Sequence, residues 1–172
     1  MDPQNAQVVA GYLANELQYE YQITRKLLSA LPDAKHGWKP HDKGMSAGQL
    51  AWHLASVDVW FLESLAAGAF SHEEPPEESR TTAQIVEFYD RNFPAAIEKV
   101  SALSAEALAK SLDFLGLMTA PAVALLGLAL KHSVHHRGQL STYLRALGEK
   151  VPSIYGGSAD EPVHAAARAE GA

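Results

Sequence analysis

The chain has 172 residues, of which 47% are hydrophobic and 20% charged, and its formal net charge is −6. These values fit one globular domain. The negative charge argues against nucleic-acid binding, which normally uses a basic surface, and gives no support for binding an acidic membrane. The lack of cysteine excludes disulfides, thiolate metal sites and cysteine nucleophiles. The sequence shows neither a signal peptide nor a run of ~18 apolar residues, so we expect a cytoplasmic protein without membrane spans.

The first two predicted helices have clear limits. Apolar residues recur at helical spacing over residues 5–31, and Pro32 ends this helix because proline cannot continue it cheaply. A second helix is predicted to begin after Ser46, which forms the pattern of a capping box with Gln49. We expect this helix to end near Gly68.

The third predicted helix follows an acidic stretch. Residues 71–80, SHEEPPEESR, contain two prolines and are interpreted as an exposed linker. A helix is then predicted from Thr81, with Gln84 again in the capping-box position, to about Val100. Pro94 lies inside the helical pattern, where we expect a kink rather than a break.

The last part of the chain contains one more long helix. Residues 104–108 are expected to form a short turn, and residues 111–118, SLDFLGLM, fit either a strand or a loop. The fourth long helix is predicted to run from Thr119, with Pro121 in its first turn, to Leu147.

Four long amphipathic helices without a convincing strand predict an all-α fold, a four-helix bundle. The long connections leave the up-and-down order of the helices open. We expect residues 1–156 to form a single domain and residues 157–172 to form a C-terminal tail that is partly disordered.

Three histidines stand on helix faces that are otherwise apolar. His132 and His136, within KHSVHHRGQL, are one turn apart and leave the same face of the fourth helix, whereas His135 is turned toward a more polar flank. His53 replaces an apolar residue on the second helix. A divalent metal would offset the cost of burying these imidazoles. Imidazole ligands suit zinc, nickel, iron or copper. The alternative is hydrogen-bonded core histidines without metal.

No fourth protein ligand is evident in the sequence. A site with three protein ligands leaves one position for water or substrate, which is the catalytic pattern. Such a metal can lower the pKa of a bound water, polarise a carbonyl or hold a thiolate.

Three segments of the chain resemble a known family. SAGQLAWHL around His53, KHSVHHRGQL around His132 and His136, and the later VPSIYG resemble the DinB-like (DinB/YfiT) superfamily, from the first helix to about Asp160. The resemblance implies a four-helix bundle with a three-histidine divalent-metal site at His53, His132 and His136, frequently in a homodimer. Relatives with assigned activities include S-transferases and a maleylpyruvate isomerase that use low-molecular-weight thiols such as mycothiol or bacillithiol.

The sequence therefore predicts a metal-dependent enzyme of the hydrolase or thiol S-transferase type. Its partners would be a small-molecule substrate or a low-molecular-weight thiol, and its metal zinc, nickel or iron. Two other functions remain open: a protein of the stress-response type that binds a metal or small ligand without turnover, and a purely structural dimeric bundle.

Several charged residues lie near the predicted site. Arg137 is a candidate to hold a substrate carboxylate, although an ion pair with an acid on a neighbouring helix is the favoured interpretation. Glu16 and Glu20 are candidates for a general base or for partners of the ligand histidines. Asp58 is a candidate for the same roles, and a solvated acidic edge is the favoured interpretation for all three.

Four aromatic residues complete the list of candidates. They could line a pocket above the metal, but aromatic residues in small bundles more often belong to the core or to an interface. These residues are Trp38, Trp52, Trp60 and Tyr143. Trp52 and Trp60 are also candidates for an apolar patch through which the chain dimerises.

Overall fold

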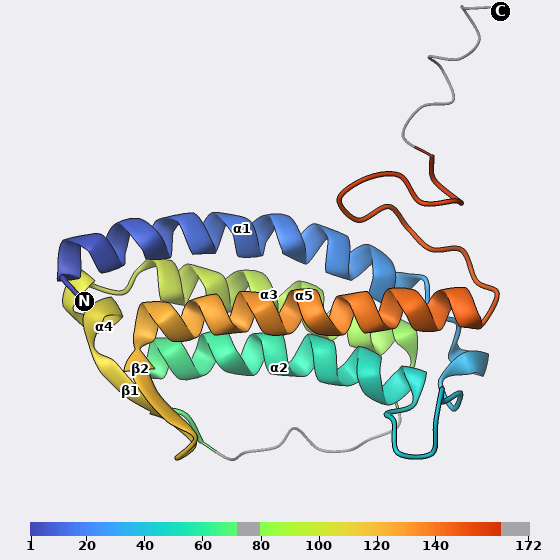
Figure 1. Ribbon diagram of the computed structural model, residues 1–172, viewed down its shortest axis with the longest axis horizontal. Helices are drawn as coiled ribbons and strands as arrows, with labels where there is room; N and C mark the ends of the chain where they lie inside the picture. The colour runs from blue at the N-terminus through green and yellow to red at the C-terminus, as the bar shows by residue number, and fades with distance from the viewer. Residues whose placement is uncertain (72–79, 163–172) are drawn as a thin grey trace, which may run out of the picture.

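The computed structural model describes residues 1–71 and 80–162, and the predicted linker and the end of the predicted tail lie largely outside them. Four long helices lie side by side (Figure 1). They are α1 (Pro3–Ser29), α2 (Ala47–Ala67), α3 (Thr82–Ser101) and α5 (Ala122–Ala146). The connections contain a 3-10 turn, η1 (Asp33–Lys35), a short helix, α4 (Ala105–Ala109), and two strands, β1 (Ser111–Phe114) and β2 (Met118–Pro121). The predicted all-α four-helix bundle is confirmed.

Both predicted capping boxes are present. The Ser46 hydroxyl accepts from the backbone N–H of Gln49 at 3.2 Å, and the Gln49 side chain accepts from the backbone N–H of Ser46 at 2.9 Å. Thr81 and Gln84 make the same reciprocal pair at the start of α3. Each box satisfies two backbone donors that the first turn leaves without helical partners. Local sequence therefore sets where α2 and α3 begin.

The start of α5 differs from the prediction. Thr119 pairs with Asp113 in the antiparallel ladder of β1 and β2, and α5 begins only at Ala122. Pro121 is the N-cap rather than a first-turn residue. Because proline disfavours helical geometry at the residue before it, Ala120 stays extended and β2 can continue to Pro121. The ambiguous segment of residues 111–118 is thus mainly a hairpin.

The packing order places α2 against the helix that carries the histidine pair. Both α1 and α2 pack against α3 and α5. In Figure 1, α2 and α3 run in the same direction, opposite to α1 and α5. The helices therefore do not alternate up and down.

The interior is mainly aliphatic and aromatic, and its buried polar or charged residues are Glu20, Thr24, Ser56, Asp58, Ser64, Ser133 and Arg137.

The segment after α5 returns to the bundle. Val151 is buried, and its backbone N–H donates to Asp160 at 2.9 Å. Asp160 also accepts from Arg145 at 2.6 Å. These contacts hold the segment that contains Tyr155 against the end of the bundle. The boundary at residue 156 between the predicted domain and the predicted tail stays a prediction. Within the described residues, no helix combines the length and the apolar character needed to cross a membrane.

Candidate metal centre

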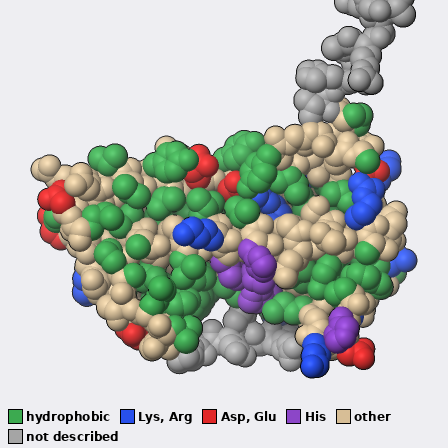
Figure 2. Space-filling model, viewed as in Figure 1, with side chains coloured by type: hydrophobic (Ala, Val, Ile, Leu, Met, Phe, Trp, Pro, Cys, Tyr) green, Lys and Arg blue, Asp and Glu red, His purple; other side chains and the backbone are tan. Residues whose placement is uncertain are grey.

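The three predicted ligand histidines come together between α2 and α5. His53 lies in the second turn of α2, and His132 and His136 lie one turn apart on α5. All three are half-buried. Figure 2 shows a group of histidine side chains at the surface, with a basic side chain on one side and a hollow close by. The group is therefore both fixed by the bundle and accessible.

The three imidazole rings approach one another through their Nε2 atoms. The Nε2 atom of His53 is 3.1 Å from Nε2 of His132 and 3.3 Å from Nε2 of His136. One nitrogen from each of the three rings lies within 4.8 Å of the other two. His135 is exposed and is not a member of this cluster, although its ring centroid is 4.8 Å from that of His136.

The outer nitrogens of the α5 histidines have acceptors. Nδ1 of His136 is 2.7 Å from the side-chain oxygen of Gln139, and Nδ1 of His132 is 3.4 Å from Oδ1 of Asp58. Oxygen acceptors of this kind favour the proton on Nδ1. Both Nε2 atoms then carry lone pairs directed toward His53. This is the tautomer that metal-ligating histidines adopt when their other nitrogen is hydrogen-bonded.

The surroundings keep two of these imidazoles neutral. Burial lowers the pKa of His53 to about 4, and the neighbouring His136 and His132 contribute to that shift. Burial likewise lowers the pKa of His136, followed by the effect of His132. A neutral imidazole has the free lone pair that a metal requires, so both rings are ready to bind at neutral pH.

Arg137 forms the ion pair that the sequence favours. Its guanidinium is 1% exposed and donates to Glu20 on α1 and to the hydroxyl of Tyr155. The prediction of a solvated Glu20 is wrong, since this residue is only 5% exposed. The Tyr155 hydroxyl donates to the other Glu20 oxygen at 2.7 Å. Glu16 is half-buried, and among the described residues it does not belong to the group that could hold a metal ion.

Asp58 is a neighbour of the site, and the favoured prediction that it is solvated is wrong. It is buried rather than solvated, and its Oδ2 accepts from Ser133 at 2.7 Å and from Tyr89 at 3.1 Å. The signal that could have identified it is its spacing from Leu54 and Leu62. Asp58 lies four residues from each, in the middle of a buried row of α2.

Comparison with known proteins identifies the family of this chain. The model of the DinB family matches residues 3–167. The chain belongs to the DinB family. This DinB-family chain is 28% identical over 148 residues to the uncharacterized protein YrdA of Bacillus subtilis, covering 84% of the chain and 86% of YrdA.

Solved structures of DinB-like proteins have the same fold. A DinB-like protein from Bacillus cereus superposes with a TM-score of 0.72 at 25% identity, covering 83% of this chain and 95% of that one. The DinB-like protein YjoA from Bacillus subtilis gives a TM-score of 0.69 at 20% identity, covering 88% and 99% respectively. The second similarity concerns the fold alone.

Each of the four aromatic candidates of this DinB-family protein packs against another aromatic ring of the same chain. The Trp52 ring lies 4.8 Å from that of Phe88, and Trp38 lies 5.2 Å from Tyr143. Trp60 joins a larger aromatic group of Phe61, Phe70 and Phe114. Within that group, the Phe61 ring is 5.7 Å from His132. Aromatic packing therefore borders one side of the histidine cluster.

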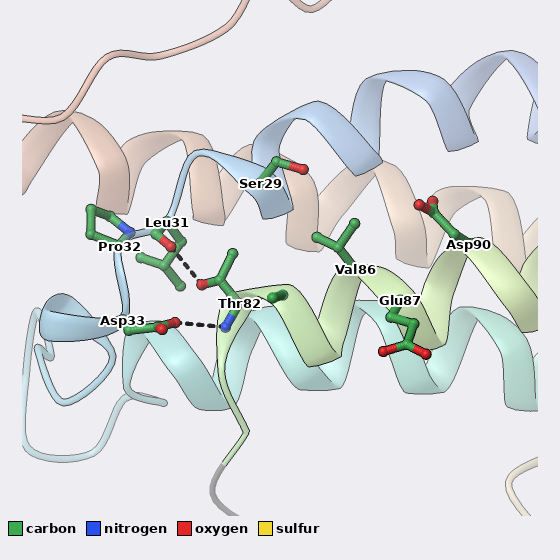
Figure 3. Close-up of a pocket in the computed structure, with 9 residues that line it drawn as sticks. Ser29, Leu31, Pro32, Asp33, Thr82, Val86, Glu87 and Asp90 are labelled. Atoms are coloured by element: carbon green, nitrogen blue, oxygen red, sulfur yellow. Dashed lines mark hydrogen bonds between the residues drawn. The ribbon is translucent and has the colours of Figure 1, made fainter.

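A cavity of about 690 Å³ lies elsewhere, between the end of α1 and the start of α3 (Figure 3). None of the three histidines lines it. Its carboxylates already have partners, since Asp33 accepts from the backbone N–H of Thr82 at 2.6 Å, Asp90 pairs with Arg25, and Glu87 pairs with Arg91. We assign no chemistry to this cavity.

Proposed function

We propose that His53, His132 and His136 bind one divalent transition metal ion through their Nε2 atoms, and that the protein is a metal-dependent enzyme. The observation that carries this proposal is the convergence of three Nε2 atoms whose outer partners direct two lone pairs inward. His53 has one proton to donate and can satisfy only one of those lone pairs. A cation accommodates all three rings at once.

The spacing of the nitrogens fits such an ion. Zinc–nitrogen bonds are about 2.0–2.1 Å long, so two nitrogens in a tetrahedral site are about 3.3–3.4 Å apart. The separations from His53 Nε2 are 3.1 and 3.3 Å. Zinc, nickel and iron all accept imidazole ligands, and the donor set does not favour one of them.

The chain's own residues define what the site can do. Among the described residues, the group able to hold an ion contains three histidines and no fourth ligand. When bound, a metal with three protein ligands supplies Lewis acidity to a water or to a small-molecule substrate at its remaining position. Gln139 holds His136 in its binding tautomer. The reaction types that fit are hydrolysis and transfer to a low-molecular-weight thiol.

Metal analysis of variants tests the binding. The wild-type protein should carry close to one equivalent of metal after purification, and His53→Ala, His132→Ala and His136→Ala should each lose it. His135→Ala is the matched control, because this exposed histidine lies on the same helix outside the cluster, and it should retain metal. Full occupancy in all three cluster variants would contradict the proposed ligands.

Turnover is tested separately on the metal-loaded protein. Small esters and amides probe hydrolysis, and a low-molecular-weight thiol with an electrophile probes transfer. Activity that the wild type and His135→Ala share, and that His132→Ala lacks, would support catalysis. Stoichiometric metal without turnover in either screen would instead favour binding without catalysis.

The proposal includes a homodimer formed through the outer face of α1. Val8, Tyr12 and Tyr19 are 75%, 63% and 57% exposed, and their spacing of four and seven residues puts them on one side of the helix. Trp52 and Trp60, the candidates from the sequence, are half-buried and pack within this chain. A second copy would cover the exposed apolar side chains of α1.

A further inference from the structure

Asp58 brings a carboxylate into the interior beside the histidine cluster. The residue is 3% exposed and lies on α2, five residues after His53. Its Oδ2 accepts hydroxyl hydrogen bonds from Tyr89 on α3 and Ser133 on α5. Three helices of the bundle therefore meet at this one side chain.

The two oxygens of Asp58 have different surroundings. Oδ2 has two hydroxyl donors, whereas Oδ1 lies 3.4 Å from Nδ1 of His132 and has no other hydrogen-bond contact with the described residues. No lysine or arginine forms an ion pair with Asp58 within the described part of the chain. Burying a carboxylate without a cationic partner is costly. A metal cation at Nε2 of His132, on the side of the ring opposite Asp58, would offset that cost.

We propose that Asp58 is a positioning residue of the metal site, accepting the Nδ1 hydrogen of His132 and supplying the buried negative charge that the bound cation requires. This inference rests on the proposed metal site and adds a residue that contacts a ligand histidine rather than the ion itself. The hydrogen bond fixes the ring so that Nε2 of His132 points at the ion. It also raises the basicity of that nitrogen, and losing such a partner typically weakens metal binding by about 10–100-fold.

The alternative is that Asp58 only joins helices through Tyr89 and Ser133. Three variants separate these roles. Asp58→Asn removes the charge but keeps a side chain that can hydrogen-bond both hydroxyls. Ser133→Ala and Tyr89→Phe each remove one hydroxyl from Oδ2 and leave the Oδ1–His132 contact in place. A structural role predicts similar effects from all three substitutions.

Zinc competition against a chromophoric chelator, on the full-length protein, measures the effect. Asp58→Asn should weaken zinc binding about 10–100-fold. Ser133→Ala and Tyr89→Phe should each change the zinc affinity by less than about threefold, because each removes one hydrogen bond of modest net strength and leaves the Oδ1–His132 contact in place. The visible spectrum of the cobalt-substituted protein should change in Asp58→Asn only. Equal zinc affinity in wild type and Asp58→Asn would overturn the role of Asp58 and leave the metal site intact.

Two further results keep the proposals distinguishable. Failure of the wild type to bind zinc would overturn the proposed function and this inference with it. Equal losses in the Asp58, Ser133 and Tyr89 variants would overturn the inference alone. If Asp58→Asn does not fold, nitrogen NMR of the metal-free wild type gives the answer. His132 protonated on Nδ1 supports the inference, and His132 protonated on Nε2 overturns it.

Discussion

Arg137, which directly follows the candidate ligand His136, forms an ion pair with Glu20 in the interior of the bundle. Successive residues of a helix are rotated by about 100°. His136 can therefore face α2 while Arg137 reaches Glu20 on α1. The hydroxyl of Tyr155 completes the pair from the C-terminal segment. The pair thus joins the helix that carries two of the histidines to α1.

Removing one partner of this pair should destabilise the protein strongly. Arg137→Met leaves the Glu20 carboxylate buried without its cation, and breaking a buried pair in this way costs about 3–5 kcal/mol. Urea unfolding measures the loss. Arg145→Met is the control, because its pair with Asp160 is half-exposed and should contribute no more than about 1 kcal/mol. Equal stabilities of the two variants would contradict the assigned role of Arg137.

Metal removal should lower the melting temperature of the wild-type protein. A ligand that binds only the folded state adds stability, about 2.7 kcal/mol when its free concentration is 100 times Kd. We expect differential scanning calorimetry to show this increase when metal is returned to the chelated protein. His132→Ala should melt at the same temperature with or without metal. A wild-type melting temperature that chelation leaves unchanged would favour histidines with a purely structural role.

The proposed dimer should be visible by light scattering. At micromolar concentration the mass should be twice the 18.5 kDa of the chain. Tyr12→Lys places a charge within the exposed apolar face of α1 and should shift the protein toward monomer, whereas Gln18→Lys, which is exposed on an adjoining face, should not. A wild-type mass near that of a single chain would exclude the dimer under these conditions.

Local signals predicted the parts of the fold that depend on few residues. The capping boxes at Ser46 and Thr81 need only a partner three residues away, and both are present. The histidine cluster was predictable for a related reason. A polar residue on an apolar helix face is visible as a break in periodicity, and the three breaks at His53, His132 and His136 do meet.

The unpredicted features depend on contacts between distant segments. Glu20 and Asp58 were assigned to solvated edges because sequence alone does not say which helix covers which face. Their partners lie 117 residues away at Arg137 and 75 residues away at Ser133. The late start of α5 has a local origin instead, in the pairing of β2 with β1 and in the N-cap position of Pro121.

Tyr21 should titrate at unusually high pH. Its hydroxyl donates to Asp90 at 2.7 Å, and burial, followed by this hydrogen bond and the Asp90 charge, raises its pKa to about 12 from 10.0. Because the folded-state pKa is the higher one, the stabilisation by neutral Tyr21 is fully present below pH 10. It is lost as the pH rises from 10 to about 12.

Ultraviolet absorbance of tyrosinate measures this ionisation. Asp90→Asn removes the charge and should bring the pKa of Tyr21 closer to its ordinary value, while Tyr21→Phe should remove one high-pH step from the titration curve. Between pH 10 and 12, the wild type should lose stability more steeply than Tyr21→Phe, because removing the Tyr21 proton is harder in the folded state than in the unfolded state and the variant has no such proton. Superimposable titration curves of wild type and Asp90→Asn would show that Asp90 does not hold the Tyr21 proton.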